Sequence, residues 1–260
     1  MESIVAGGLQ QILHGDSDMS FVLDDTSSVM HLVATNLASG YTLSTDSTIF
    51  LWFKKSATGK QAALGYAYSF GSIPADIHAV YAEQSGGDLI HGRAEPYGAS
   101  GGDVATGNVY SANTWTPVIS TVTLGGSVTI KMGGGSKVSG GPVASAWQFA
   151  SFSRVMLGEN PSSAYTQTGQ TLRVAHVGCW KVALSDSDAA SLLGGANPLA
   201  INAANLVEYW SGASLTGYNS TVLSWSGGTG TVNDSDNPTV DDPPGGASAV
   251  PLLMQMYHGG

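Results

Sequence analysis

Cysteine is almost absent from this sequence. Cys179 is the one cysteine among 260 residues, so no disulfide can form within the chain. A domain of this length buries about three quarters of the surface that its unfolded chain exposes, and it needs no covalent cross-links. A lone cysteine between Gly178 and Trp180 in a strand-like run is typically a small buried hydrophobe. We therefore expect neither a disulfide framework nor a catalytic thiolate.

Positive charge is also scarce. Nine lysines and arginines stand against 19 aspartates and glutamates, which gives a formal net charge of −10. Nucleic acids and anionic membrane surfaces both attract cationic patches, so this composition argues against both as partners. No apolar run approaches the ~20 residues of a membrane span. The first fifteen residues, MESIVAGGLQQILHG, lack a cationic leader and a continuous apolar segment, so we expect no secretory signal peptide.

Carboxylate pairs with the spacing of a glycosidase are missing as well. Glycoside hydrolysis needs two carboxylates ~5–10 Å apart, and a strand places residues two positions apart on one face. The glutamates are Glu2, Glu83, Glu95, Glu159 and Glu208. None has an acidic neighbour two residues away, and Asp234 and Asp236, which have this spacing, lie in a turn-rich polar segment.

A hydrolase-like motif is present but lacks its context. The stretch GASGG at residues 98–102 matches G-x-S-x-G, which exposes its serine only at a turn from a strand into a helix. Here the motif lies in a glycine-rich stretch, 86–107, that we interpret as a loop. The sequence therefore predicts no enzymatic activity.

What the sequence does contain is a series of short apolar runs separated by turn residues. In residues 48–55, Ile49, Leu51 and Phe53 alternate with Phe50 and Trp52. Such alternation is typical of a strand. The runs 114–124 and 128–132 form a plausible hairpin across GGS. With 35 glycines and no long helical period, these signals predict an all-β protein, a two-sheet antiparallel sandwich.

One short helix is expected near residues 186–193. Ser185 and Asp188 have the spacing of a capping box, and Gly194 is placed to end the helix in the left-handed conformation. Upstream, five large apolar residues recur with period two, which predicts one buried face of a strand that leads into the helix. These residues are Leu172, Val174, Trp180, Val182 and Leu184.

The motifs STIFLWFKK, TWTPVIST, VMLGEN and LRVAHVGCWKVALSDSDAASLLGGANPL…NLVEYW resemble those of a laminin-G-like, concanavalin-A-like jelly-roll domain, over residues 27–225. Thr116 and Pro117 depart from the family, which often has histidine after the central tryptophan, here Trp115. The resemblance implies a two-sheet jelly roll with the domain limits 1–26 (N-terminal segment), 27–242 (jelly roll) and 243–260 (C-terminal tail). Domains of this kind occur in bacteriophage virion proteins, as decoration or fibre components.

Two interpretations of such a domain remain open. The one that we favour is a non-enzymatic structural virion protein, a capsid decoration, cement or fibre component that binds other virion proteins or copies of itself. Such a protein is made in the host cytoplasm and needs no signal peptide. The alternative is a carbohydrate-binding, lectin-like adhesion module with cell-surface glycans as partners. A glycanase is disfavoured by the missing carboxylate pair.

Candidate ligand contacts are few. Trp147, flanked by polar turns, is the tryptophan that we expect to be exposed and able to contact a sugar. We predict no cofactor and leave calcium open. Its candidate oxygen ligands are Asp16, Asp18, Asp24, Asp25 and residues 233–237, none of which completes a twelve-residue calcium loop. The histidines show no metal-ligand spacing.

The C-terminal tail carries a cluster of large apolar residues. They are Leu252, Leu253, Met254, Met256 and Tyr257. Burying each is worth ~1.5–3 kcal/mol, so the segment is not expected to stay in solvent. Either it folds back onto its own domain, or it docks on a neighbouring subunit as an added strand.

Overall fold

The computed structural model describes residues 20–25, 31–34, 37, 41–42, 45–57, 62–69, 76–82, 89–96, 98–147, 151–158, 170–226 and 231–234. These residues form two antiparallel sheets and one α-helix, which confirms the all-β class. The helix is too short and too polar to cross a membrane, and no other helix within these ranges could do so. The C-terminal tail cluster lies outside the described residues.

The first sheet has the order β11-β10-β9-β4-β13-β1-β16, with β14 also paired to β13. Its strands are β1 (Ser20–Asp25), β4 (Ser47–Lys55), β9 (Thr116–Val122), β10 (Ser127–Met132), β11 (Val138–Pro142), β13 (Gln170–Trp180), β14 (Leu206–Trp210) and β16 (Thr231–Asp234). Because β1 pairs with β13, the sandwich includes residues that we had expected to form a separate N-terminal segment, 1–26.

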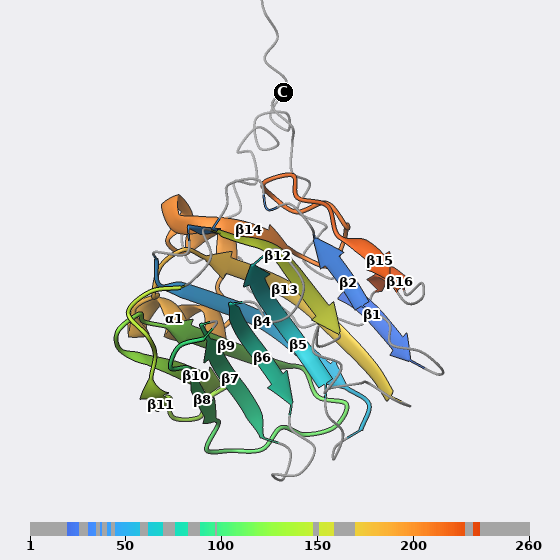
Figure 1. The fold of residues 1–260 in the computed structure, drawn as a ribbon. Coiled ribbons are helices and arrows are strands. Elements are labelled where there is room, and N and C mark those ends of the chain that lie inside the picture. The colour runs from blue at the N-terminus through green and yellow to red at the C-terminus, as the bar shows by residue number, and fades with distance from the viewer. Residues whose placement is uncertain are drawn as a thin grey trace, which may run out of the picture.

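The second sheet has the order β15-β2-β12-β5-β6-β7-β8, with β3 paired to β12. Its strands are β2 (His31–Ala34), β3 (Tyr41–Thr42), β5 (Ala62–Ser69), β6 (Ile77–Ala82), β7 (Ile90–Glu95), β8 (Gly102–Ala105), β12 (Ser151–Gly158) and β15 (Ser224–Ser226). The two sheets stack face to face, with α1 (Asp186–Leu193) on the outer side of the first sheet (Figure 1).

Strand β4 is buried on both faces, as its alternation predicts. Ile49, Leu51 and Phe53 belong to the main core between the sheets. Phe50 belongs to a second core on the other side, beneath α1, and Trp52 packs against that core. The expected hairpin is also confirmed, since β9 and β10 pair in antiparallel register.

The glycine-rich stretch 86–107 contains β7 and β8. The prediction that this stretch is a loop is therefore wrong. The two sheets approach so closely here that some inward positions have no room for a side chain. A Cβ atom at Gly92 would lie 2.7 Å from the Ser120 hydroxyl, and one at Gly102 would lie 2.8 Å from Val128. The GASGG motif, 98–102, is the turn between these strands and runs into β8, so it is no nucleophile elbow.

Strand β13 breaks the predicted alternation. A register shift between Ala175 and Gly178 surrounds His176, whose φ is 51°. As a result, Leu172 and Val174 face the main core, whereas Trp180 faces the second core under α1. The prediction that these apolar residues share one face is therefore wrong, because the bulge moves the later residues to the other side.

Helix α1 covers the predicted residues, 186–193, but the left-handed residue that follows it comes one position later than predicted. The Ser185 side chain accepts a hydrogen bond from the Asp188 amide, and Asp188 reciprocates, which completes the capping box. Gly194 has φ −84° and is not left-handed. The left-handed residue is Gly195, φ 95°, and the amides of Gly195 and Ala196 donate to the carbonyls of Leu192 and Ser191. This is a Schellman motif.

Gly178 supports the second core and can be tested by substitution. A Cβ atom there would lie 2.5 Å from the Trp180 ring, whose indole N–H donates to the Ile201 carbonyl at 2.8 Å. We expect Gly178→Ala to lower the free energy of unfolding by ~1–3 kcal/mol, because the ring must shift in a packed site. Gly134→Ala is the control, since no atom lies within 4 Å of its Cβ position. Equal urea midpoints for the two variants would contradict this packing.

Candidate functional site

The aromatic residue expected to contact sugar is buried. Trp147 is 6% exposed and belongs to the main core. Its indole N–H donates to the Thr45 carbonyl at 3.1 Å. The prediction of an exposed Trp147 is therefore wrong: Ser145, two residues earlier, is exposed, whereas the Trp147 ring closes the core.

The calcium candidates receive no structural support from the described residues. Asp16 and Asp18 lie outside them, and the backbones of Asp24 and Asp25 pair with β13 in the first sheet. Within the described ranges, no three His, Cys, Asp or Glu side chains gather in a group that could hold a metal ion.

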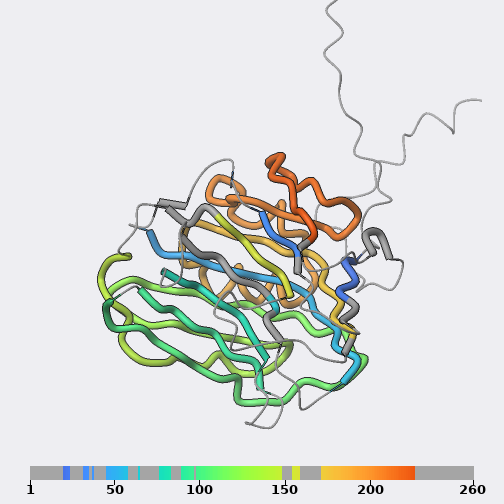
Figure 2. The backbone as a smooth tube through the Cα atoms, turned by 45° about the vertical axis from the view of Figure 1, so that its right-hand side comes forward, coloured from blue at the N-terminus to red at the C-terminus, as the bar shows by residue number. Residues whose placement is uncertain are grey.

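Among the residues that the structure describes, the exposed aromatic side chain is instead Tyr218, which is 59% exposed. Tyr218 lies in the segment 211–223, which connects β14 to β15. This segment is orange to red in Figure 2 and lies away from the green strands β8 to β10. Thr216 and Val222 form an antiparallel bridge across this segment, and Val222 is 54% exposed.

This segment is organised by a buried carboxylate. Glu208, on β14, is fully buried. Its Oε1 accepts hydrogen bonds from the amides of Tyr209 and Asn219, at 3.0 and 2.7 Å, and its Oε2 accepts one from the Thr221 amide at 3.0 Å. A carboxylate buried without such donors would be strongly destabilising. We call residues 211–223 the Glu208-anchored loop.

Further contacts fix the same loop. The Asn219 side chain donates to the Val207 carbonyl at 2.8 Å, and the Trp210 indole donates to the Thr221 carbonyl at 3.1 Å. A Cβ atom at Gly217 would lie 2.6 Å from the Glu208 carboxyl carbon, so the loop closes directly over the carboxylate. The backbone of the loop is thus held from both sides.

The surface of the Glu208-anchored loop is neutral and rich in hydroxyl groups. Its sequence, SGASLTGYNSTVL, contains no charged residue. The exposed side chains alternate along the hairpin, namely Thr216, Tyr218, Ser220 and Val222. Tyr, Ser, Gly and Asn are also the residues that dominate antibody binding loops, because they combine rigid aromatic area with adaptable hydrogen bonding. In the sequence, this site is marked by the uncharged, Ser-, Thr- and Gly-rich composition of residues 211–223 and by no recognised motif.

A serine–histidine cluster in the interior resembles a catalytic pair but is enclosed. The His78 ring nitrogens hydrogen-bond the hydroxyls of Ser47 and Ser120, at 2.9 and 3.0 Å. All three residues are fully buried, and burial lowers the pKa of His78 to about 3. The neutral ring therefore joins β6 of the second sheet to β4 and β9 of the first, and substrate has no access to it.

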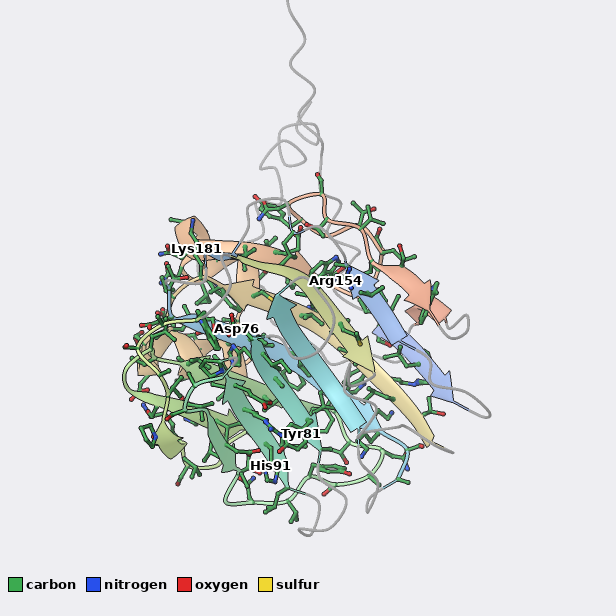
Figure 3. All side chains as sticks on the ribbon, viewed as in Figure 1. Asp76, Tyr81, His91, Arg154 and Lys181 are labelled. Atoms are coloured by element: carbon green, nitrogen blue, oxygen red, sulfur yellow. The ribbon has the colours of Figure 1, made fainter. Side chains whose placement is uncertain are left out.

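A second polar cluster lies on the outer face of the second sheet, where Tyr81 and His91 lie next to each other (Figure 3). Their rings stack with centroids 4.9 Å apart. Asp103 Oδ1 bonds the His91 ring at 2.9 Å, and Oδ2 accepts from the Tyr81 hydroxyl at 2.6 Å. This cluster joins β6, β7 and β8, and its acceptor oxygens are already engaged.

The comparisons with known proteins concern the fold alone. No family model matches the sequence, and no curated protein matches it. Among solved structures, a native heptameric SAP-like pentraxin from Limulus polyphemus has TM-score 0.54 at 10% identity, over 85% of this chain and 99% of the pentraxin chain. A protein from Bacteroides ovatus described as a "putative carbohydrate binding protein" has TM-score 0.53 at 14% identity, over 84% of this chain and 61% of that one.

The binding domain of botulinum neurotoxin serotype D also matches, with TM-score 0.50 and 14% identity, over 68% of this chain and 42% of that chain. The shared feature is the two-sheet architecture. The protein is a jelly roll. The concanavalin-A-like fold implied by the sequence motifs is thereby confirmed, whereas likeness at this identity says nothing of what the jelly roll binds.

We predict that Glu208→Gln destabilises the anchored loop. A glutamine offers one acceptor oxygen, so at least one backbone amide would face an NH₂ group. The free energy of unfolding should fall by roughly 1.5–3 kcal/mol. Amide hydrogen exchange at Asn219 and Thr221 should also accelerate. Glu95→Gln, at a partly exposed side chain, is the control and should change stability by less than about 0.5 kcal/mol. Unchanged exchange at both amides would refute the anchoring role.

The Asp103 cluster predicts a pH dependence. Burial raises the pKa of Asp103, but the hydrogen bonds from His91 and Tyr81, with the charges of His91 and Arg93, outweigh it, so the pKa lies below its ordinary value. The stabilisation is therefore complete above the unfolded pKa of about 3.9 and is lost as pH falls through the folded value. The stability difference between the wild type and Asp103→Asn should shrink from pH 6 to pH 2. A difference that stays constant over this range would contradict the assignment.

Proposed function

We propose that this jelly roll is a non-catalytic carbohydrate-binding module and that the Glu208-anchored loop is its recognition element. The observation that carries the proposal is the exposed Tyr218 ring on a loop whose backbone is fixed by a buried carboxylate. An aromatic face offers apolar area to the C–H face of a sugar ring and keeps a polar hydroxyl at its edge.

The rigidity of the loop is what suits it to binding. Ordering a flexible loop on binding costs free energy, and a loop that is already ordered avoids that cost. The hydrogen bonds of Glu208 supply this order in the free protein. The exposed hydroxyls of Thr216 and Ser220, close to Tyr218 in the hairpin, can exchange hydrogen bonds with sugar hydroxyls.

The absence of catalysis is part of the proposal. Glu208 is the one described glutamate near the Glu208-anchored loop. Its carboxylate accepts hydrogen bonds from backbone amides. Glu95 pairs with Arg93 at 2.9 Å on the second sheet. Neither carboxylate is arranged to act as an acid or nucleophile across a glycosidic bond, which requires two such groups on either side of the substrate.

The setting in which the module works is a separate proposal. The sequence favoured a virion decoration or fibre protein, and a glycan-binding jelly roll fits such a particle as a contact with the host surface. The match with a carbohydrate-binding candidate of the same fold supports glycan binding by analogy and is neutral on the virion.

The test is a glycan-binding screen followed by titration of three variants. Tyr218→Ala should weaken binding of the selected glycan about tenfold or more, because removal of an aromatic anchor costs about 2 kcal/mol. Tyr218→Phe should retain most of the affinity, since the ring remains. Val109→Ala removes another exposed apolar side chain, at 57% exposure, and should leave binding unchanged. Glycan binding that is equal in Tyr218→Ala and wild type would refute the proposed site, and no binding to any glycan would refute the function.

A further inference from the structure

An open groove lies on the outer face of the first sheet, lined by residues of β9, β10 and the first turn of α1. These elements lie apart from the segment between β14 and β15 that forms the Glu208-anchored loop (Figure 1). It encloses about 210 Å³. Pockets for drug-sized ligands have ~300–1,000 Å³, so this groove suits one small unit of a ligand. We call it the Lys131 groove. Its polar lining consists of Thr121, Thr123, Thr129, Lys131, Lys137 and Asp186.

The strand register builds the floor of the groove. Thr129 of β10 lies directly opposite Thr121 of β9, and Lys131 lies opposite Ile119. The first pair therefore places two threonine side chains next to each other on one face of the sheet, and the second places the Lys131 side chain next to that of Ile119. Leu184 and Ala189 add an apolar wall on the side of α1. The groove thus combines an apolar surface with hydroxyl groups and a cation.

The charge in the groove is positive within an acidic protein. The ammonium of Lys137 binds Asp186 at 2.5 Å. The hydrogen bond and charge of Lys137, with the charge of Lys131, hold the pKa of Asp186 below its ordinary value. Lys131 itself forms no ion pair with any described residue, so two ammonium groups meet one carboxylate here, in a chain of net charge −10.

We propose that the Lys131 groove binds an acidic sugar unit, a pyranose that carries a carboxylate or sulfate group. Lys131 pairs with the acidic group, Thr123 and Thr129 bond the ring hydroxyls, and the apolar wall contacts the C–H face of the ring. This site is distinct from the neutral Tyr218 surface and does not rest on it.

The first experiment compares small probes by NMR titration of the amide resonances of Thr121, Thr129 and Lys131. Glucuronate and glucose 6-sulfate should each give saturable shifts, and the two probes distinguish a carboxylate from a sulfate. Glucose should bind at least about tenfold more weakly, because it lacks the group that forms a charge-assisted hydrogen bond. Glucose that binds as well as its acidic derivatives, or inorganic sulfate that binds as tightly as glucose 6-sulfate, would overturn the assignment.

The second experiment uses charge variants with opposite expected signs. Lys131→Gln should weaken glucuronate binding about tenfold or more. Asp186→Asn should strengthen it, because the carboxylate that repels the ligand is gone. A loss of folding would weaken binding in both variants, so opposite signs identify the charge effect. Lys181→Gln, which changes the same charge outside the groove, should bind like the wild type. Tyr218→Ala should also bind glucuronate normally, which separates this site from the proposed function of the loop. Equal affinities in Lys131→Gln and wild type would refute the proposal.

Discussion

Burial of β4 on both faces is the constraint around which the jelly roll is arranged. One face of the strand contributes Ile49, Leu51 and Phe53 to the core between the sheets, and the other contributes Phe50 to the core beneath α1. A strand with one polar, solvent-exposed face would need no helix to cover that face. Because β4 is apolar on both sides, the chain must cover the outer side, and the segment after β13 supplies that cover as a capped helix. The Lys131 groove forms where α1 lies beside β9 and β10 on this outer side.

Two buried polar groups fix what hydrophobic packing alone leaves free. His78 ties the two sheets together through a pair of serines, and Glu208 ties the loop after β14 to its own strand. Breaking a buried polar network by removing one partner costs more than the network contributes, because the remaining groups lose their partners. These groups therefore specify geometry. Glu208 fixes the backbone of a loop whose Tyr218 side chain is exposed to solvent.

The sequence predicted those parts of the fold that depend on local pattern. The alternation in β4, the β9–β10 hairpin and the capping box of α1 each follow from neighbouring residues. Prediction from the sequence failed where the structure is decided by a contact between residues far apart in the chain. Gly92 and Gly102 are strand residues because the opposite sheet approaches them, and the bulge at His176 moves Trp180 to another core. Tyr218 was missed because its exposure follows from a carboxylate ten residues earlier, whereas Trp147 was judged by its polar neighbours alone.

The close approach of the sheets also governs how this molecule can meet copies of itself. At one end of the sandwich, β8 and β11 are the outermost described strands of their sheets. A Cβ atom at Gly140 of β11 would lie 2.5 Å from the Asp103 carbonyl oxygen of β8. The two edges thus shield each other, and neither offers an open ladder on which another chain could add a strand. At this end of the molecule, glycine allows the close approach that protects both edges against strand addition, and it does so beside a charged residue on β8, Asp103, and a proline on β11, Pro142.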